Sequence, residues 1–376
     1  MSQKPFYLIA HRCNSSDKVE EALIKGANAI ECDLRYNDQH NVIVVNHDSS
    51  LFYERDNLAA YLDQVKDLAN IHNHLSLLIF DCKFDDPDVA PKLLSTIRKH
   101  LTNHININIL ISVATYNEGK FFARIIGDLK SREGVAIDYH NNPNEVSSYF
   151  DDQGVNNFFY GNGIFTEAFG PNVFTSIAEA IRLKASNKII KQVYVWTLNA
   201  QDSMIKYLRM GVDGIFVDNP DIENLKSILN NQFGDLRRLA TREEDAFNPP
   251  SLTGQAIFKI DVHTGEKSGA GTDANLYVTL YGEGGEVHTN KLNPLIKGNA
   301  FERGSVDTVT LNLKDVGRIQ KIRVWHDNKY LGAAWFLDEI VITNLTQQQK
   351  FKFPCNAWLE GSNNARELNA QQVVFS

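Results

Sequence analysis

The chain has 376 residues, of which 43% are hydrophobic, and its 46 Asp and Glu against 38 Lys and Arg give a formal net charge of −8. This composition excludes collagen-like and disordered chains, and the length suits two domains, or one barrel with a smaller companion. The acidic balance argues against a protein that binds along a nucleic-acid backbone, because phosphate contacts need a basic surface.

The cysteines and the N-terminus bear on the compartment. The four cysteines have no spacing typical of a disulfide framework or a zinc site, and we expect free thiols in a reducing compartment. The first residues reach polar His11 and Arg12 too soon for a signal peptide, and no stretch has the roughly 18 apolar residues of a membrane span. We expect a cytoplasmic or peripheral-membrane protein, with non-classical secretion as the alternative. The cysteines are Cys13, Cys32, Cys82 and Cys355.

Short apolar runs alternate with helical patterns as far as about residue 230, as in parallel strands joined by helices. The pattern predicts a TIM (β/α)8 barrel over residues 1–235, and no G-x-G-x-x-G follows the first strand to suggest a dinucleotide-binding sheet. The expected strands are Phe6–Arg12, Ala29–Tyr36, Val42–His47, Leu75–Phe84, Ile105–Val113, Val135–Tyr139, Asn156–Gly161, Gln192–Leu198 and Gly214–Val217. The expected helices are Asp17–Lys25, Leu58–Ile71, Val89–Leu101, Glu118–Leu129, Val173–Lys184, Asp202–Met210 and Ile222–Asn230.

The texture of the chain changes after the barrel. Residues 236–254 are charged, contain Pro249-Pro250 and are expected to form a linker. From residue 255 to 376, closely spaced strands with Gly and Asn turns between them predict an antiparallel β-sandwich. Its expected strands are Ala256–His263, Asn275–Tyr281, Thr308–Leu313, Ile319–Trp325 and Trp335–Asn344.

Two acidic residues on the second strand suggest a metal site. Glu31 and Asp33 are two positions apart, so their side chains project from the same face of the strand. Two adjacent carboxylates repel each other inside a barrel unless a cation lies between them. Oxygen ligands favour a hard ion, either Mg²⁺ or Ca²⁺.

The same spacing recurs on a later strand, where Asp81 and Lys83 share a face. Asp81 would be a third carboxylate ligand, and Lys83 could neutralise a phosphate oxygen. His11 and His47 end two further strands, in the region where barrels place their catalytic groups. A base, an acid, a metal ion and a cation are together the minimum set for phosphodiester cleavage.

These motifs resemble those of a known superfamily. His11-Arg12, Gly26–Asp33, Val44–Asp48, Val195–Asn199 and Gly211–Pro220 resemble the glycerophosphodiester phosphodiesterase superfamily. Phe80-Asp81-Cys82-Lys83 and Tyr160–Ile164 are more similar to its sphingomyelinase D, or phospholipase D toxin, branch. The resemblance covers nearly all of residues 5–225.

The resemblance implies a role for each matching residue. His11 and His47 match the acid/base pair, and Lys83 matches the phosphate-binding lysine. Trp196 matches an aromatic residue that closes over the substrate, although a buried core tryptophan is the alternative. Asn219 matches a polar substrate-binding residue near the end of the last strand, although Asp218 and Asn219 could equally form a turn before Pro220. The residues that match the Mg²⁺ ligands are Glu31, Asp33 and Asp81.

The sequence also departs from the family. Cys13 replaces the usual glycine after His-Arg, and the glutamate-asparagine-threonine motif of the phosphodiesterases is missing. The connection from His47 to Asp81 is short and lacks a proline-threonine-leucine segment, which favours the phospholipase D branch. The cysteine-closed catalytic loop of the spider enzymes is absent, so their substrate preference does not transfer.

The second domain resembles a PLAT domain, the lipoxygenase-homology β-sandwich, in segments such as Ile260–Gly265, Gly269–Val278 and Trp335–Ile340. Such domains dock onto membranes or proteins, sometimes with Ca²⁺. Asp273 could be a Ca²⁺ ligand, with a turn aspartate as the more ordinary alternative. Tyr330 and Leu331 are expected on an exposed loop, and Trp325 and Trp335 in the core.

The leading hypothesis is a metal-dependent phosphodiesterase of phospholipase D type. It would cleave or cyclise the head group of a sphingolipid or lysophospholipid, and the sandwich would dock it on a membrane. The alternatives are an enzyme for soluble glycerophosphodiesters and a lipid-binding adaptor without catalysis. The adaptor is disfavoured because the histidines, carboxylates and lysine are all present.

Overall fold

The computed structural model describes residues 3–47, 57–115, 118–163, 171–187, 190–234, 236–249, 254–296, 298–330 and 332–373. These residues fall into two compact units, one that contains residues 3–207 and one that contains residues 254–373. Within the described ranges, no helix is both long enough and apolar enough to cross a membrane.

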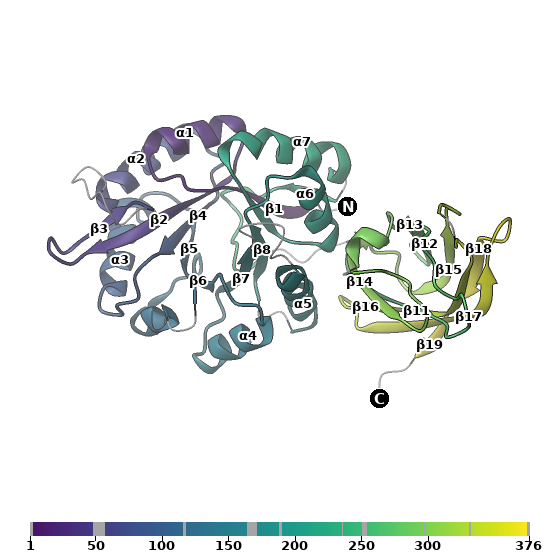
Figure 1. Cartoon of the computed structure of the whole chain (residues 1–376). Coiled ribbons are helices and arrows are strands. Elements are labelled where there is room, and N and C mark those ends of the chain that lie inside the picture. The colour runs from purple at the N-terminus through teal and green to yellow at the C-terminus, as the bar shows by residue number, and fades with distance from the viewer. Residues whose placement is uncertain are drawn as a thin grey trace. The chain divides into compact units, whose positions relative to one another are not determined.

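The first unit is a closed barrel of eight parallel strands (Figure 1). The barrel closes because β1 pairs in parallel with both β2 and β9. The short strand β3 (Val42–Val45) turns back antiparallel to β2, so it forms a hairpin beside the barrel. The eight strands are β1 (Lys4–Ala10), β2 (Ala29–Asn37), β4 (Leu77–Cys82), β5 (Asn108–Val113), β6 (Glu133–Ile137), β7 (Phe158–Gly163), β8 (Gln192–Trp196) and β9 (Gly214–Val217).

Helices surround the barrel and connect its strands (Figure 1). One of them, α4 (Pro143–Asp152), was not predicted, although its start carries the usual signals: the Asn142 side chain accepts from two backbone N–H groups and Pro143 is the first residue. The other α-helices are α1 (Ser16–Lys25), α2 (Leu58–Ile71), α3 (Ala90–Ile97), α5 (Pro171–Asn187), α6 (Gln201–Met210) and α7 (Ile222–Phe233). Shorter elements are the π-helix η2 (Arg98–Thr102) and the 3₁₀-helix η6 (Asn219–Asp221).

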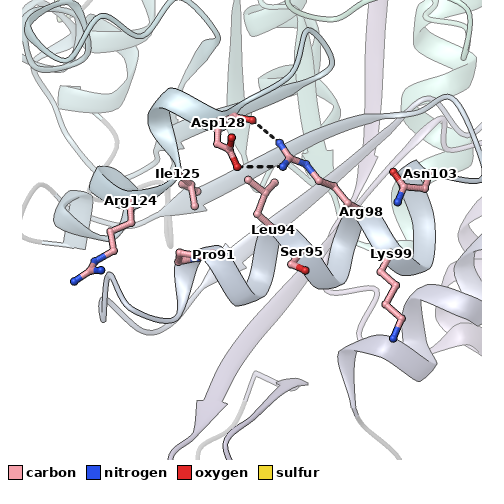
Figure 2. Close-up of a pocket in the computed structure, with 9 residues that line it drawn as sticks. All are labelled: Pro91, Leu94, Ser95, Arg98, Lys99, Asn103, Arg124, Ile125 and Asp128. Atoms are coloured by element: carbon pink, nitrogen blue, oxygen red, sulfur yellow. Dashed lines mark hydrogen bonds and ion pairs between the residues drawn. The ribbon is translucent and has the colours of Figure 1, made fainter.

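The helix predicted over Glu118–Leu129 is wrong. Two 3₁₀-helices, η3 (Glu118–Arg124) and η4 (Ile126–Asp128), stand in its place. A pocket lies between them and α3 (Figure 2), but none of the predicted site residues lines it. Both of its arginines are paired, because Arg98 binds Asp128 and Glu133 while Arg124 lies 2.7 Å from Asp88.

The segment predicted as a linker begins as part of the barrel. Residues 237–239 form β10 (Arg237–Leu239), which pairs with β1. Phe247 packs with the side chains that fill the barrel interior. Asn108 accepts from the Ala246 N–H at 3.0 Å and donates to the Glu244 carbonyl at 2.9 Å. Residues 236–249 are therefore not a free linker, although their polar composition suggested one, because their backbone is hydrogen-bonded to the barrel.

A buried ion cluster joins the first and last strands of the barrel. Asp213 lies 2.7 Å from both Lys4 and Lys184, and its side chain is 2% exposed. Burial alone would raise the pKa of Asp213, but Lys184 and Lys4 outweigh it and hold the pKa at about 2. This carboxylate therefore stabilises the fold above about pH 4, and its contribution is lost as the pH falls toward 2.

Replacing Asp213 by asparagine should lower the free energy of unfolding by about 3 kcal/mol, since it leaves buried cations without a counter-charge. Urea unfolding at neutral pH measures the loss. Asp152→Asn, an exposed substitution in the last turn of α4, is the control and should change little. An unchanged unfolding midpoint in Asp213→Asn would contradict a stabilising role for the cluster.

The second unit consists of two antiparallel sheets (Figure 1). Their inner faces enclose one hydrophobic core. Trp335 is fully buried there as predicted, whereas Trp325 faces outward and stacks on Tyr277. The five-stranded sheet contains β11 (Gln255–Thr264), β14 (Val306–Lys314), β16 (Trp335–Asn344), β17 (Gln349–Leu359) and β19 (Gln371–Val373). The four-stranded sheet contains β12 (Leu276–Gly282), β13 (Gly285–His288), β15 (Ile319–His326) and β18 (Ala365–Asn369), and η7 (Asn293–Leu295) is a 3₁₀ turn.

Candidate active site

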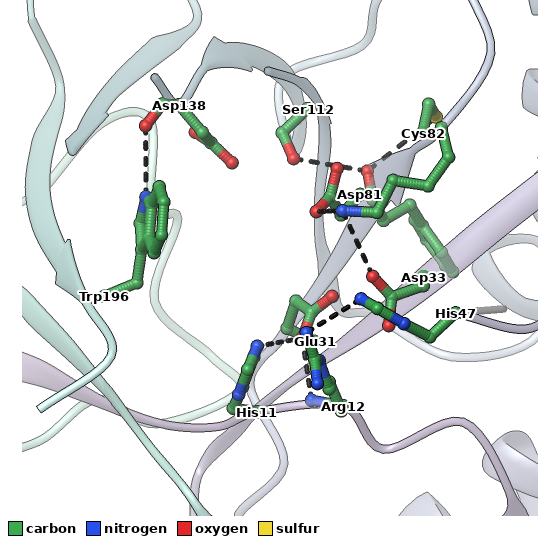
Figure 3. A network of polar contacts seen from close by, with 12 residues as sticks. His11, Arg12, Glu31, Asp33, His47, Asp81, Cys82, Ser112, Asp138 and Trp196 are labelled. Atoms are coloured by element: carbon green, nitrogen blue, oxygen red, sulfur yellow. Dashed lines mark hydrogen bonds and ion pairs between the residues drawn. The ribbon is translucent and has the colours of Figure 1, made fainter. Parts of the chain in front are cut away.

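Three carboxylates meet at the carboxyl end of β4 and beside it on β2. Glu31 and Asp33 project from β2 into the barrel, and Asp81 stands beside Asp33 in the strand register. One oxygen from each of the three lies within 4.8 Å of the others. Glu31 and Asp33 are 3% and 2% exposed, so both are screened from water. The structure thus brings together the three residues predicted as metal ligands (Figure 3).

The electrostatics of these carboxylates call for a cation. Burial, followed by the charges of Asp33 and Asp81, raises the pKa of Glu31 well above its usual value. Its Oε2 accepts from the Arg12 backbone N–H at 2.8 Å, but its buried Oε1 has no hydrogen-bond partner. A divalent cation would supply the missing partner and offset the repulsion, so the residues present fit a metal ion.

Lys83 and Asn14 complete this side of the site. The Lys83 Nζ contacts the Asp81 carboxylate and lies 3.2 Å from Asp33. Burial opposes its charge, but Asp81 and Asp33 outweigh burial and raise its pKa. Asn14 donates to Asp33 at 2.8 Å. Lys83 therefore remains cationic beside the carboxylates, as a group that neutralises phosphate must be.

His11 lies opposite, at the end of β1. Its Nδ1 is 2.9 Å from Asp218 Oδ1, and its Nε2 is 4.0 Å from Glu31. Asn199 donates to the other oxygen of Asp218 at 2.6 Å, which fixes that carboxylate. Burial lowers the pKa of His11, although the hydrogen bond to Asp218 opposes this effect. Asp218 thus holds Nδ1 of His11 in place, and Nε2 is directed toward the acidic cluster.

His47 follows β3 and has a different partner. The Arg12 guanidinium lies 2.7 Å from His47 Nε2, and Arg35 donates to the His47 carbonyl at 2.9 and 2.8 Å. Arg12 itself has a left-handed backbone, with φ of 53°. That turn allows its N–H to reach Glu31 while its side chain reaches His47. The sequence motif His11-Arg12 thus places a cation beside the second histidine, a contact that was not predicted.

The far wall of the site contains one predicted residue, Trp196, and three that were not predicted, Asp138, Tyr139 and Tyr194. Trp196 is partly exposed and donates from Nε1 to the Asp138 carbonyl at 3.1 Å (Figure 3). The Asp138 carboxylate accepts from Tyr194. Burial, with the charge of Asp81 in addition, raises the pKa of Asp138 to about 7. Tyr139, 53% exposed, lies beside Trp196 with ring centroids 6.1 Å apart.

Two predicted residues lie elsewhere. The Asn219 amide donates to Glu21 of α1 at 3.0 Å, so it faces the helices and not the barrel interior. Asp218, which was not among the predicted site residues, takes the position beside His11. Asp273 is exposed and, within the described part of the chain, the one group of three or more ligand-type side chains close enough to share a metal is Glu31, Asp33 and Asp81.

The predicted sandwich loop is described in part. Tyr330 is 66% exposed, in agreement with the prediction, and Leu331 lies outside the described residues.

Comparison with protein families gives two matches that together span most of the chain. A model described as dermonecrotic toxin SPH matches residues 1–247. A model described as PLAT/LH2 domain matches residues 258–375. The first match contains all the site residues of the barrel, and the second contains the β-sandwich.

Similar proteins match one part or the other. A dermonecrotic toxin of Loxosceles boneti, LbSicTox-betaIA1a, is 26% identical over an aligned length of 274 residues, and the alignment covers 64% of this chain and 97% of the toxin. Human lipoxygenase homology domain-containing protein 1 is 37% identical over 114 residues, and this chain spans 5% of its length. Among solved structures, a glycerophosphodiester phosphodiesterase from Parabacteroides distasonis covers 61% of this chain and 99% of its own, at 21% identity and a TM-score of 0.46.

Proposed function

Because the chain belongs to the dermonecrotic toxin SPH family and carries a PLAT/LH2 domain after its barrel, we propose that it is a metal-dependent phosphodiesterase of phospholipase D type. Its substrate would be a sphingolipid or a lysophospholipid, cleaved or cyclised at the head group. The PLAT domain would dock the enzyme on the lipid surface.

The observation that carries the proposal is the grouping of Glu31, Asp33 and Asp81 between two histidines. Each histidine has its own partner, Asp218 for His11 and Arg12 for His47. A structural ion cluster would pair its charges, whereas Glu31 keeps a buried oxygen without a partner. Mg²⁺ held there, or Ca²⁺ as the alternative, would act as a Lewis acid on the phosphoryl oxygens.

The side chains around the three carboxylates are proposed to neutralise charge on the phosphoryl group and to transfer protons. Lys83 offsets the negative charge that builds up on the phosphoryl group. Asp218 binds Nδ1 of His11 and would stabilise the imidazolium that forms when Nε2 removes a proton from the attacking hydroxyl. His11 is therefore the proposed base. His47 is the proposed acid for the leaving alcohol. Because Arg12 can only donate hydrogen bonds, its contact with Nε2 orients the ring and must be released before that nitrogen can carry the proton.

The same site would act on soluble glycerophosphodiesters if the sandwich docked only to proteins. A lipid substrate is supported by the aromatic pair beside the site, the exposed Tyr139 and the partly exposed Trp196, since aromatic rings settle at lipid interfaces. Rates on micellar lysophosphatidylcholine and on glycerophosphocholine, its deacylated counterpart, separate the two. We expect the lysolipid to be turned over at least tenfold faster.

Both substrates carry the same head group, so the comparison isolates the acyl chain. Equal or faster turnover of glycerophosphocholine would contradict the lipid assignment but not the phosphodiesterase. No turnover of either substrate, with sphingomyelin also inert, would contradict the proposed reaction.

A further inference from the structure

Strand β7 carries no side chain at its last two inward-facing positions. Phe159 packs in the barrel interior, and Gly161 and Gly163 lie two and four residues further along the same strand, so they face the same way. Neither glycine is among those with a left-handed backbone, so the backbone conformation alone would admit another residue. The groups that stand in front of β7 therefore decide whether a side chain fits there.

Two aromatic side chains of the next strand occupy that space. In the strand register, Gly161 pairs with Tyr194 of β8 and Gly163 pairs with Trp196. A Cβ atom at position 161 would lie 2.2 Å from Cε2 of Tyr194, and one at position 163 would lie 1.9 Å from Cδ2 of Trp196. Carbon atoms in contact stay about 3.5–4.0 Å apart, so each ring lies across a glycine where an alanine would not fit.

Both rings reach over β7 to the same residue, Asp138, which follows β6. The Tyr194 hydroxyl donates to the Asp138 carboxylate. Trp196 Nε1 donates to the Asp138 carbonyl at 3.1 Å (Figure 3). Tyr194 is itself fixed, since it is 2% exposed and packs on Phe216 with ring centroids 5.2 Å apart. Side chains of β8 thus cross the two glycines and hold both the backbone and the carboxylate of Asp138.

This wall is built from different strands than the rest of the site. Figure 3 shows Asp138 and Trp196 on one side of the polar network and Asp33 and His47 on the other. The metal carboxylates and the two histidines lie on β1 to β4 or directly after them, whereas the wall comes from β6, β7 and β8. The wall can therefore shift while the metal ligands stay in place.

We propose that Gly161 and Gly163 are positioning residues of the active site: their missing side chains let Tyr194 and Trp196 cross β7 and hold Asp138 at the far wall. This rests on the proposed function and goes beyond it, because it assigns the placement of that wall to a strand that offers no reactive group there. Gly161 is the better position to test, because the three atoms nearest to an added methyl group there all belong to side chains. At Gly163 the methyl group would also lie 2.2 Å from the Trp196 backbone oxygen.

The test is a double-mutant cycle in the full-length protein. Gly161→Ala should raise the KM for lysophosphatidylcholine about tenfold and leave the turnover number within about threefold, because the methyl group pushes Tyr194 away from Asp138 but not the metal ligands. Tyr194→Phe, which loses only the hydroxyl, should raise the KM by a similar factor. In a Tyr194→Leu background, Gly161→Ala should change the KM less than about twofold, because the ring that it displaces is gone. Mg²⁺ affinity, measured by calorimetric titration, should match wild type in Gly161→Ala.

Gly127→Ala is the matched control. Gly127 is exposed in η4 without a left-handed backbone, and no atom outside its own segment lies within 4 Å of an added Cβ, so the same change there should keep the wild-type KM. Urea unfolding of the four proteins of the cycle is a readout that needs no substrate. Gly161→Ala should lower the unfolding midpoint more when Tyr194 is present than in Tyr194→Leu. If no substrate were turned over, the proposed reaction would be wrong, while the unfolding cycle would still test the contact.

Three results would overturn the proposal. One is a wild-type KM in Gly161→Ala. Another is an equal rise in KM with and without the Tyr194 ring, which would separate the effect of Gly161 from that ring. The third is a parallel loss of turnover number and Mg²⁺ affinity in Gly161→Ala, which would indicate a general distortion of the barrel instead of a displaced wall.

Discussion

Replacing Asp81 with alanine should reduce lipid turnover by about three orders of magnitude. The change removes one of three carboxylates that share a site, and with it several kcal/mol of transition-state stabilisation from a bound cation, at 1.36 kcal/mol for each tenfold in rate. It also frees Lys83 from one of its two carboxylate partners. Steady-state rates at saturating Mg²⁺ measure the loss, and calorimetric titration with Mg²⁺ should show weakened binding.

Asp85→Ala is a suitable control, since Asp85 is an exposed carboxylate four residues further along the same segment. It should leave both the rate and Mg²⁺ affinity close to wild type. Wild-type turnover by Asp81→Ala would rule out the metal site, because the remaining pair could not hold the cation equally well.

His11→Ala should lower the turnover number by a factor of 10² to 10⁴, the usual contribution of a positioned base. Asp218 tests how His11 works, because it contacts the ring and is not expected to contact the substrate. Asp218→Asn still offers an oxygen to His11 Nδ1 and should retain more of the turnover number than Asp218→Ala. Both variants should change KM little. Steady-state kinetics on lysophosphatidylcholine provide these values.

Equal losses in Asp218→Asn and Asp218→Ala would contradict the positioning role of Asp218. Near wild-type turnover by His11→Ala would contradict its assignment as the base. Glu223→Gln on α7, an exposed position, serves as the control for carboxylate removal.

Most of the candidate site could be predicted from the sequence because inward-facing residues alternate along each barrel strand. Glu31 and Asp33 are two residues apart on one strand, and Asp81 and Lys83 are two residues apart at the end of another. The side chains of each pair therefore project into the barrel interior together. The same rule also shows why Asn219 was the wrong choice. Phe216 packs in the barrel interior, so Asp218 faces inward and Asn219 outward.

Asp138 could have been found by the same argument. Ala136 lies in the barrel interior, so the residue two positions later must face the site. Without knowing which strands close the barrel, however, the sequence offers a short apolar run with a single acidic residue after it. A turn aspartate is the ordinary interpretation of such a residue. The alternation of inward- and outward-facing residues could not predict the role of Arg12, because its contact with His47 depends on a left-handed backbone conformation after the strand.

Two parts of the barrel could not be predicted from local pattern. The segment Glu118–Leu129 has helical spacing but forms two 3₁₀-helices. The charged segment after residue 236 looked like a linker because its binding partners, such as Asn108 and Arg132, lie far away in the sequence. In both cases contacts between distant residues decide the structure and outweigh local preference.

The most direct test of metal-dependent lipid cleavage is to incubate the wild-type protein with lysophosphatidylcholine and, separately, with glycerophosphocholine, and to identify the phosphorus products by ³¹P NMR. We expect lysophosphatidylcholine to give a cyclic phosphate or a phosphomonoester in the presence of Mg²⁺, and EDTA to stop the formation of that product. Unchanged lysolipid in the presence of Mg²⁺, or the same product with EDTA, would contradict a metal-dependent lipid phosphodiesterase.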